Sequence, residues 1–166
     1  MTPAIVRTGA RVLLIDADDR VLLIHERTGD QADLDHWLTP GGGVEEGEDL
    51  ATAAVREVFE ETGLRIELAE GAPAIYSRRR SWSWRHLSFD QTDHYFTARV
   101  ASDLPIEPAA LTEVEVSLLL GYRWWTVAEL QASAETIEPP ALADLVIQVL
   151  GDGVWSQAGG GSVGGP

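Results

Sequence analysis

The order of apolar and polar segments predicts an α/β fold in which a central mixed sheet lies between helices, as an α/β/α sandwich. Two segments rich in Val, Leu and Ile, Ile5–Asp16 and Val21–Glu26, have the composition of neighbouring strands separated by a short polar turn. Two later segments, about 50–62 and 142–150, repeat apolar residues at the spacing of one helix face. Strands and helices therefore alternate along the chain, which favours this class over an all-helical or all-strand fold.

Between the first strands and the first helix, the chain is polar and rich in glycine. We expect Thr28–Asp35 to be a loop and Trp37–Thr39 to be a short strand that Pro40 ends. The predicted helix over Leu50–Thr62 has one apolar stripe. That stripe consists of Ala51, Ala54, Val55, Val58 and Phe59. Gly63 stands where a left-handed C-terminal cap is expected.

The second half of the chain predicts two long strands at about Ala74–His86 and Leu87–Val100, and a short strand at Tyr122–Trp125. Pro105 and Pro108 indicate a loop between them that runs toward Glu115.

Two helices are expected after the last predicted strand. Thr126 and Glu129 have the spacing of a capping box at the start of a short helix. The final helix follows Pro139-Pro140 and should end at Gly151. We expect one domain over residues 1–155, followed by a flexible Gly-rich tail over 156–166.

Composition excludes several classes of function. The formal charge of −15, from 27 acidic and 12 basic residues, argues against a nucleic-acid polymer or an anionic membrane as partner. Without a long apolar run or a secretory signal at the N-terminus, we expect a cytoplasmic protein. The chain has no cysteine, so any metal must bind oxygen or imidazole ligands. Every basic side chain is an arginine, so arginine and metal must hold any phosphate.

Three glutamates of the predicted helix suggest a metal site. Glu57, Glu60 and Glu61 are three and four residues apart, so their carboxylates lie on one stripe beside the apolar face. Like charges at this spacing repel, whereas Mg²⁺ or Mn²⁺ would bind such hard oxygen ligands. The alternative is an ordinary acidic surface on an acidic protein.

A run of glycines, Gly41-Gly42-Gly43, comes just before this helix. Glycines let the backbone approach a ligand closely, although a simple turn has the same composition. Arg56 follows Glu48 by eight residues, and a salt bridge between them would brace the loop against the helix. An ordinary surface pair is the alternative.

The segment Gly42–Leu64 resembles the Nudix box, G-x5-E-x7-R-E-U-x-E-E-x-G-U, where U is a bulky apolar residue. The nine defined positions hold Gly42, Glu48, Arg56, Glu57, Val58, Glu60, Glu61, Gly63 and Leu64, and no position departs. The segments 37–45 and 122–130 resemble the usual flanks of the box in this family. The resemblance covers about residues 5–150, although only the box is specific.

This resemblance implies a Nudix fold with the box as a loop–helix–loop, and an enzyme that uses Mg²⁺, with Mn²⁺ as a substitute. Such enzymes hydrolyse a small-molecule nucleoside diphosphate linked to another group, by water attack at phosphorus. The resemblance places Glu57, Glu60 and Glu61 at metal-ligand positions, with the Gly41 carbonyl as a further ligand. In some relatives Glu57 activates the water instead. Arg56, together with the brace residues Gly42, Glu48 and Gly63, would hold this arrangement.

Relatives often supply one more carboxylate from outside the box, and its position varies. Asp93 could be a ligand carried by a strand, whereas Glu113 and Glu115, on the expected loop, could supply a mobile base. For each of the three, a solvated acid is the alternative.

Residues for substrate recognition are less specific. Arg78, Arg80, Trp82 and Trp84 combine positive charge with indoles in an otherwise acidic chain. Arginine can hold phosphate and tryptophan can stack on a nucleobase. The alternatives are an amphipathic edge strand or a contact between two copies in a homodimer.

Three other functions compete with the hydrolase. A catalytically silent nucleotide-binding or sensor module would not need to keep every acid of the box. An isoprenoid diphosphate isomerase would need a cysteine. An mRNA-decapping enzyme fits poorly with the acidic composition.

Overall fold

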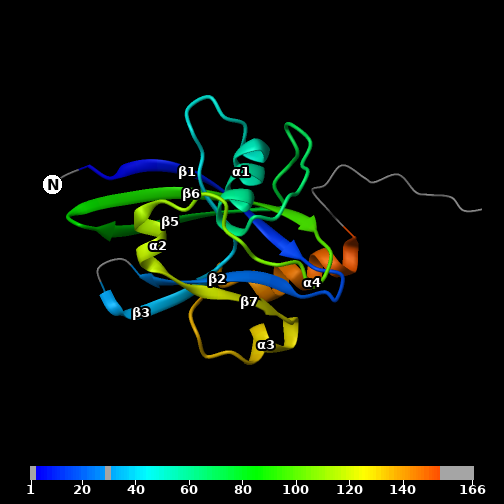
Figure 1. Ribbon diagram of the computed structural model, residues 1–166. Coiled ribbons are helices and arrows are strands. Elements are labelled where there is room, and N and C mark those ends of the chain that lie inside the picture. The colour runs from blue at the N-terminus through cyan, green and yellow to red at the C-terminus, as the bar shows by residue number, and fades with distance from the viewer. Residues whose placement is uncertain (1–2, 29–30, 154–166) are drawn as a thin grey trace, which may run out of the picture.

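The computed structural model describes residues 3–28 and 31–153 as one mixed sheet with helices (Figure 1). The strands are β1 (Ile5–Ile15), β2 (Val21–Thr28), β3 (Gln31–Leu38), β4 (Gly41–Gly43), β5 (Tyr76–Trp84), β6 (Leu87–Arg99), β7 (Leu119–Trp125) and β8 (Ile137–Glu138). The helices are α1 (Leu50–Thr62), α2 (Glu113–Leu118), α3 (Val127–Ala132) and α4 (Leu142–Asp152). The expected tail over 156–166 lies outside the described residues. Among those that are described, no helix has the length and apolar character needed to cross a membrane.

The sheet divides into two groups of strands that diverge from the β1–β2 turn. Its order is β5-β6-β1-β2-β3-β8, with β4 paired to β1 and β7 paired to β2. Strand β1 pairs with β6 in parallel along its whole length, from Ile5 opposite Phe89 to Ile15 opposite Arg99. By contrast, the register of β1 with β2 is the single pair Ile15 and Val21 beside the turn. The two groups therefore separate away from this turn, and α2 lies near their open end (Figure 1).

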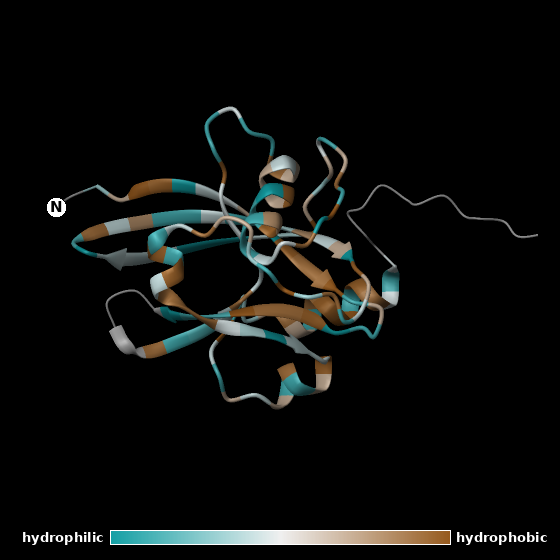
Figure 2. Ribbon diagram, viewed as in Figure 1, coloured by the Kyte–Doolittle hydropathy of each residue, from teal (hydrophilic) through white to brown (hydrophobic). Residues whose placement is uncertain are grey.

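Helices cover both faces of the sheet, as the sequence predicts. Alternate residues of β1 point to opposite faces. Ala10, Val12 and Leu14 pack against the buried side of α1, whereas Leu13 and Ile15 pack with residues of α3 and α4. Figure 2 shows the hydrophobic segments concentrated where the strands meet these helices. The structure confirms the predicted pattern, because the apolar residues of the strands and of the helices face one another on both sides of the sheet.

Three predicted elements are wrong. Most of the expected loop Thr28–Asp35 is strand β3, which pairs with β2 despite its polar sequence. The expected loop toward Glu115 contains the helix α2, which begins at a capping box formed by Thr112 and Glu115. Helix α4 continues through Gly151, and its left-handed cap is Gly153, with φ of 63°. Pairing partners and capping bonds decide these elements more than local composition does.

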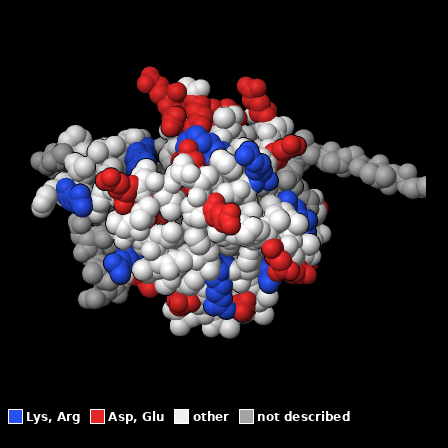
Figure 3. All heavy atoms as spheres, viewed as in Figure 1, with Lys and Arg blue, Asp and Glu red and all other residues white. Residues whose placement is uncertain are grey.

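Charged side chains of both signs cover the surface. Figure 3 shows acidic side chains at the top of the view, over the loops beside α1, with arginines near them. Exposed acids of these loops include Glu45, Glu46, Glu67 and Glu70. The negative net charge is therefore concentrated partly around the helix that carries the box.

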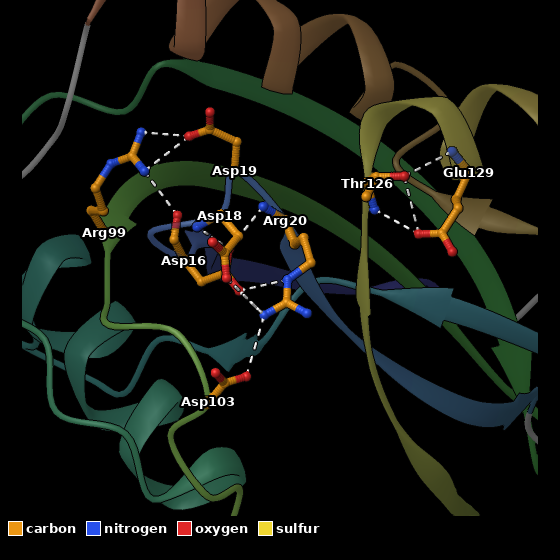
Figure 4. Close-up of polar contacts among 8 residues, drawn as sticks. All are labelled: Asp16, Asp18, Asp19, Arg20, Arg99, Asp103, Thr126 and Glu129. Carbon is orange, nitrogen blue, oxygen red and sulfur yellow. Dashed lines mark hydrogen bonds and ion pairs between the residues drawn. The ribbon is translucent and has the colours of Figure 1, made fainter.

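The β1–β2 turn is held by a buried aspartate. Asp16 is fully buried, and its Oδ1 accepts hydrogen bonds from the backbone N–H groups of Asp18 and Arg20 at 3.0 and 2.9 Å. Its Oδ2 accepts from Arg20 Nε at 2.8 Å, and Arg99 donates to the Asp16 carbonyl at 2.8 Å (Figure 4). The predicted capping box of Thr126 and Glu129 is also present. These bonds fix the point from which the two strand groups diverge.

Candidate functional site

Helix α1 orients the box carboxylates. Its N-cap Asp49 accepts hydrogen bonds from the N–H groups of Ala51 and Thr52, and its C-cap Gly63 has φ of 72°. A side chain at Gly63 would also meet the Glu107 carbonyl, because a Cβ there would lie 2.1 Å from that oxygen. Since the apolar stripe faces the sheet, the adjacent face with Glu57 and Glu61 turns toward the glycine strand β4. Both glutamates are buried, with 8% and 7% of their surface exposed.

Arg56 connects the loop to the helix, so the predicted brace is present. Its Nε and Nη2 each donate to Glu48 at 2.8 Å, and Nη2 also donates to the Gly43 carbonyl at 2.9 Å. Its Nη1 donates to Glu57 at 2.8 Å and to Glu60 at 3.3 Å. The hydrogen bond from Arg56 lowers the pKa of Glu48. This bidentate geometry is the strong form of the arginine–carboxylate pair.

The glycines of β4 let carboxylates approach the backbone. A Cβ at Gly42 would lie 2.7 Å from the Glu57 carboxyl carbon, so only glycine leaves room for this carboxylate. The Gly41 N–H donates to Glu61 Oε2 at 2.7 Å. Gly41 has φ of 143°, and a Cβ there would lie 2.3 Å from the Ala10 carbonyl. The strand is therefore glycine for steric reasons on both of its faces.

Three carboxylates converge beside this strand. Glu57, Glu61 and Glu115 each offer an oxygen within 4.8 Å of the others. Two come from α1 and the third from α2, 54 positions further along the chain than Glu61. Burial raises the pKa of Glu57 and raises that of Glu61 well above its usual value. Buried acids that repel one another, on a backbone cleared by glycines, fit a hard divalent cation.

The other predicted acids lie elsewhere. Glu60 is half-buried and contacts Arg56 at 3.3 Å, and it is not a member of the three-carboxylate cluster. Glu113 is exposed in the first turn of α2. Of the three candidates outside the box, Glu115 is the one that joins the box glutamates.

Asp93 is fully buried and bound by other side chains. It lies 3.4 Å from Arg11 Nε, and it accepts from Arg80 Nε at 2.6 Å and from Gln91 Nε2 at 2.5 Å. Burial raises the pKa of Asp93, but Arg11 and Arg80 outweigh burial, so the pKa lies below its usual value. A Cβ at Gly9 would lie 2.1 Å from the Asp93 carboxylate, so this glycine makes room for the ion pairs.

A pocket of about 300 Å³ opens onto the three carboxylates. Among the predicted recognition residues, Arg80 and Trp82 line it, whereas Arg78 pairs with Glu138 and Trp84 contacts Arg85. Strand β5 alternates half-buried and exposed residues, so Trp82 and Trp84 share a face, as expected from the sequence.

Sequence reasoning missed several residues that line this pocket, among them Arg7, Arg11 and Glu26. They lie on β1 and β2, in segments whose apolar residues identify strands but whose charged residues match no motif. Burial raises the pKa of Glu26, although nearby Arg11 opposes this. The sequence offered one signal, which is that Arg11 stands within an otherwise apolar strand.

The model of the NUDIX domain family matches residues 6–145. The chain belongs to this family. The match covers most of the chain and includes the complete box, so it confirms the family that the motif predicts.

Curated relatives match over part of the chain. An RNA pyrophosphohydrolase of Roseobacter denitrificans is 37% identical over 79 residues, which are 48% of this chain and 45% of that protein. Nudix hydrolase 7 of Arabidopsis thaliana is 41% identical over 63 residues, 37% of this chain and 22% of that protein. The chain thus spans half or less of the length of the curated relatives it matches.

Solved Nudix structures share the fold. The MutT protein from Methanosarcina mazei Go1 superposes with a TM-score of 0.60 at 15% identity, covering 92% of this chain and 99% of that one. A NUDIX hydrolase from Nitrosomonas europaea gives a TM-score of 0.59 at 21% identity, with 89% of each chain covered. The predicted Nudix fold, with the box as a loop–helix–loop, is confirmed.

Proposed function

We propose that this Nudix protein is a Mg²⁺-dependent hydrolase that cleaves a diphosphate linkage in a nucleoside diphosphate linked to another group. The observation that carries the proposal is the convergence of Glu57, Glu61 and Glu115 within 4.8 Å, at a pocket also lined by arginines. Carboxylates alone would repel a diphosphate, whereas carboxylates with a bound cation would attract it. Arginines on the other wall of the pocket suit the same anionic substrate.

The donor set fits Mg²⁺, with Mn²⁺ as a substitute. Glu57, Glu61 and Glu115 would hold the ion, and the box pattern adds Glu60 and the Gly41 carbonyl as further candidate ligands. When bound, the metal neutralises charge on the phosphates and makes a bound water more acidic.

The chain's own residues would divide the remaining work. Arg56 holds Glu57 at 2.8 Å, and the Gly41 N–H holds Glu61 at 2.7 Å, so both carboxylates are oriented before substrate arrives. Glu57 or Glu115 would accept the proton of the attacking water, because both reach the pocket. The arginines would orient the phosphates for attack in line with the leaving oxygen.

A small nucleotide suits the site better than a polymer. The net charge of −15 opposes a long anionic strand, whereas a pocket of about 300 Å³ suits a small molecule. Relatives named for both kinds of substrate, an RNA pyrophosphohydrolase of Roseobacter denitrificans and a putative 8-oxo-dGTP diphosphatase of Bacillus subtilis, support cleavage of a phosphate anhydride.

A hydrolysis screen tests the proposal. Purified protein is incubated with nucleoside triphosphates, nucleotide sugars, ADP-ribose and dinucleoside polyphosphates, in Mg²⁺, in Mn²⁺ and in EDTA. We expect release of nucleotide or phosphate from at least one compound in Mg²⁺ and none in EDTA. Tight binding of these compounds without any hydrolysis in either metal would favour the silent binding module instead.

A further inference from the structure

Three arginines of the pocket lie on one face of the sheet, and two of them share one buried carboxylate. Arg7 on β1 and Arg80 on β5 both lie opposite Gln91 of β6, so the two side chains point to the same face of the sheet. Arg11 lies on this face too, since it is four residues along β1 from Arg7. Asp93 contacts both Arg11 and Arg80. Asp93 is thus divided between two guanidinium groups, and Arg7 is not one of them.

Arg7 is the least compensated of the three. It is exposed and lines the pocket, and its aromatic neighbour is the Phe89 ring, 5.9 Å from the guanidinium carbon. Within the part of the chain that the structure describes, Arg7 has no carboxylate within ion-pair distance. This is unusual in a protein whose acids outnumber its bases by 27 to 12.

Arg80 is held rigidly but keeps free donors. Its Nε donates to Asp93 at 2.6 Å, and its guanidinium lies 4.6 Å from the centre of the Trp82 ring. Trp82 in turn stacks on Phe89, with centroids 5.2 Å apart and planes 16° from parallel. Among the described residues, the terminal nitrogens of Arg80 find no acceptor. Burial, and then nearby Arg11, lowers the pKa of Arg80, whereas Asp93 opposes this shift.

Strand β4 brings these arginines next to the carboxylates. A Cβ at Gly42 would lie 2.7 Å from the Glu57 carboxylate, and a Cβ at Gly43 would lie 2.7 Å from Arg7 Nη2. Consecutive Cα atoms are about 3.8 Å apart. These two glycines face opposite sides of the strand, but the two arginines and the three carboxylates line the same pocket, so an anion at Arg7 would lie within reach of a phosphate chain held at the carboxylates.

We propose that Arg7 and Arg80 form an anion subsite for a phosphate beyond the diphosphate at the carboxylates, so that the protein selects nucleotides with at least three consecutive phosphates. This inference rests on the proposed function, because that function puts a diphosphate at Glu57, Glu61 and Glu115. The inference adds the chemical class of the substrate and names the two side chains that would bind its additional phosphate. Arginine forks bind phosphate through paired hydrogen bonds, which gives them both affinity and geometry.

Calorimetric titration of AMP and of methylene-bridged, non-hydrolysable forms of ADP and ATP into the protein in Mg²⁺ tests the subsite without turnover. The wild type should bind the ATP form about tenfold more tightly than the ADP form, the size expected for one set of charge-assisted hydrogen bonds. Arg7→Gln should reduce this ratio toward one and leave AMP binding unchanged. Arg80→Lys keeps the charge but loses the planar fork, so it should also reduce the ratio.

Arg65→Gln is the matched control. Arg65 is exposed, lies 4.4 Å from the Phe59 ring and does not line the pocket. It removes the same charge and should keep the wild-type ratio. Circular dichroism would verify that each variant is folded. The subsite is contradicted if the wild type binds the ADP and ATP forms alike, or if Arg7→Gln keeps the wild-type ratio.

The two proposals fail separately. A protein that binds the non-hydrolysable ATP more tightly than the non-hydrolysable ADP, but hydrolyses no nucleotide in Mg²⁺, would contradict the hydrolase and keep the subsite. A protein that hydrolyses nucleotides in Mg²⁺ but binds the triphosphate no more tightly than the diphosphate would contradict the subsite and keep the hydrolase.

Discussion

Glu57 and Glu61 are buried acids whose positions depend on single donors. Arg56 Nη1 holds one at 2.8 Å, and the Gly41 N–H holds the other at 2.7 Å. Burial raises the pKa of both, so each pays for exclusion from water in the absence of a cation. Glu115 completes the group from a different element. Without a cation, the burial of these carboxylates therefore costs stability, as expected if they serve the proposed metal site.

Two glutamates of α2 should differ in their effect on turnover. Glu115→Gln should lower Mg²⁺-dependent turnover by about 100-fold or more, because it removes a charge from the metal-binding group. Glu113→Gln, two residues away and exposed, should change turnover little. Steady-state kinetics measures both, and equal effects would contradict the role of Glu115.

Box glutamates should behave like Glu115. We expect Glu61→Gln and Glu60→Gln to lower turnover by orders of magnitude with little loss of folding stability, Glu60 because the box pattern makes it a ligand. Kinetics and thermal melts of the same samples separate the two effects. Near-normal activity in both variants would overturn the metal-ligand assignment.

Asp93 should contribute to stability instead of metal binding. Its pKa is below the usual value, since Arg11 and Arg80 outweigh burial, so its contribution is fully present above about pH 4 and is lost as the pH falls through the folded pKa. Asp93→Asn should lower the free energy of unfolding by about 3 kcal/mol at pH 7, because it leaves buried arginines without a counter-charge.

Urea unfolding at pH 7 and pH 3 measures this difference, which should shrink at pH 3. The control is Asp90→Asn, which breaks the exposed pair with Arg79 and should have a smaller effect. A deficit for Asp93→Asn that is the same at both pH values would contradict the ionic origin.

At the scale of elements, helix α1 could be predicted to the residue, whereas β3, α2 and the end of α4 could not. The helix has an apolar stripe, a capping aspartate and a glycine cap that agree with one another. Strand β3 has a polar sequence and exists through its pairing with β2. Helix α2 is six residues long and has no buried residue, so its sequence has no apolar stripe that would predict a helix.

Two glycines at the end of α4 should respond in opposite ways to substitution by alanine. Gly151 lies inside the helix, with open space where a Cβ would be, whereas Gly153 is the left-handed cap with φ of 63°. Gly151→Ala should stabilise the protein by about 0.5–1 kcal/mol through helix propensity. Gly153→Ala should destabilise it by about 1 kcal/mol, because alanine resists the left-handed conformation. Denaturant unfolding measures both, and stabilisation by Gly153→Ala would contradict the cap.

At the scale of the whole molecule, two diverging groups of strands bring distant residues into one pocket. Arg7 and Arg11 come from β1, Glu26 from β2, and Arg80 from β5. The box glutamates could be predicted because their spacing is a property of one helix. Arg7, Arg11 and the choice of Glu115 over Asp93 could not be, because they depend on strand register and on where α2 lies against β2. An acidic protein thereby acquires a local concentration of arginines suited to an anionic substrate.

The most direct test of this account is a Mn²⁺ titration of the metal-free protein, with the free ion measured by electron paramagnetic resonance. Wild-type protein should bind Mn²⁺, and the combined variant Glu57→Gln, Glu61→Gln and Glu115→Gln should bind it at least about tenfold more weakly while remaining folded. Equal Mn²⁺ affinity in the two proteins would mean that the metal is held elsewhere, and the proposed catalytic site would be wrong.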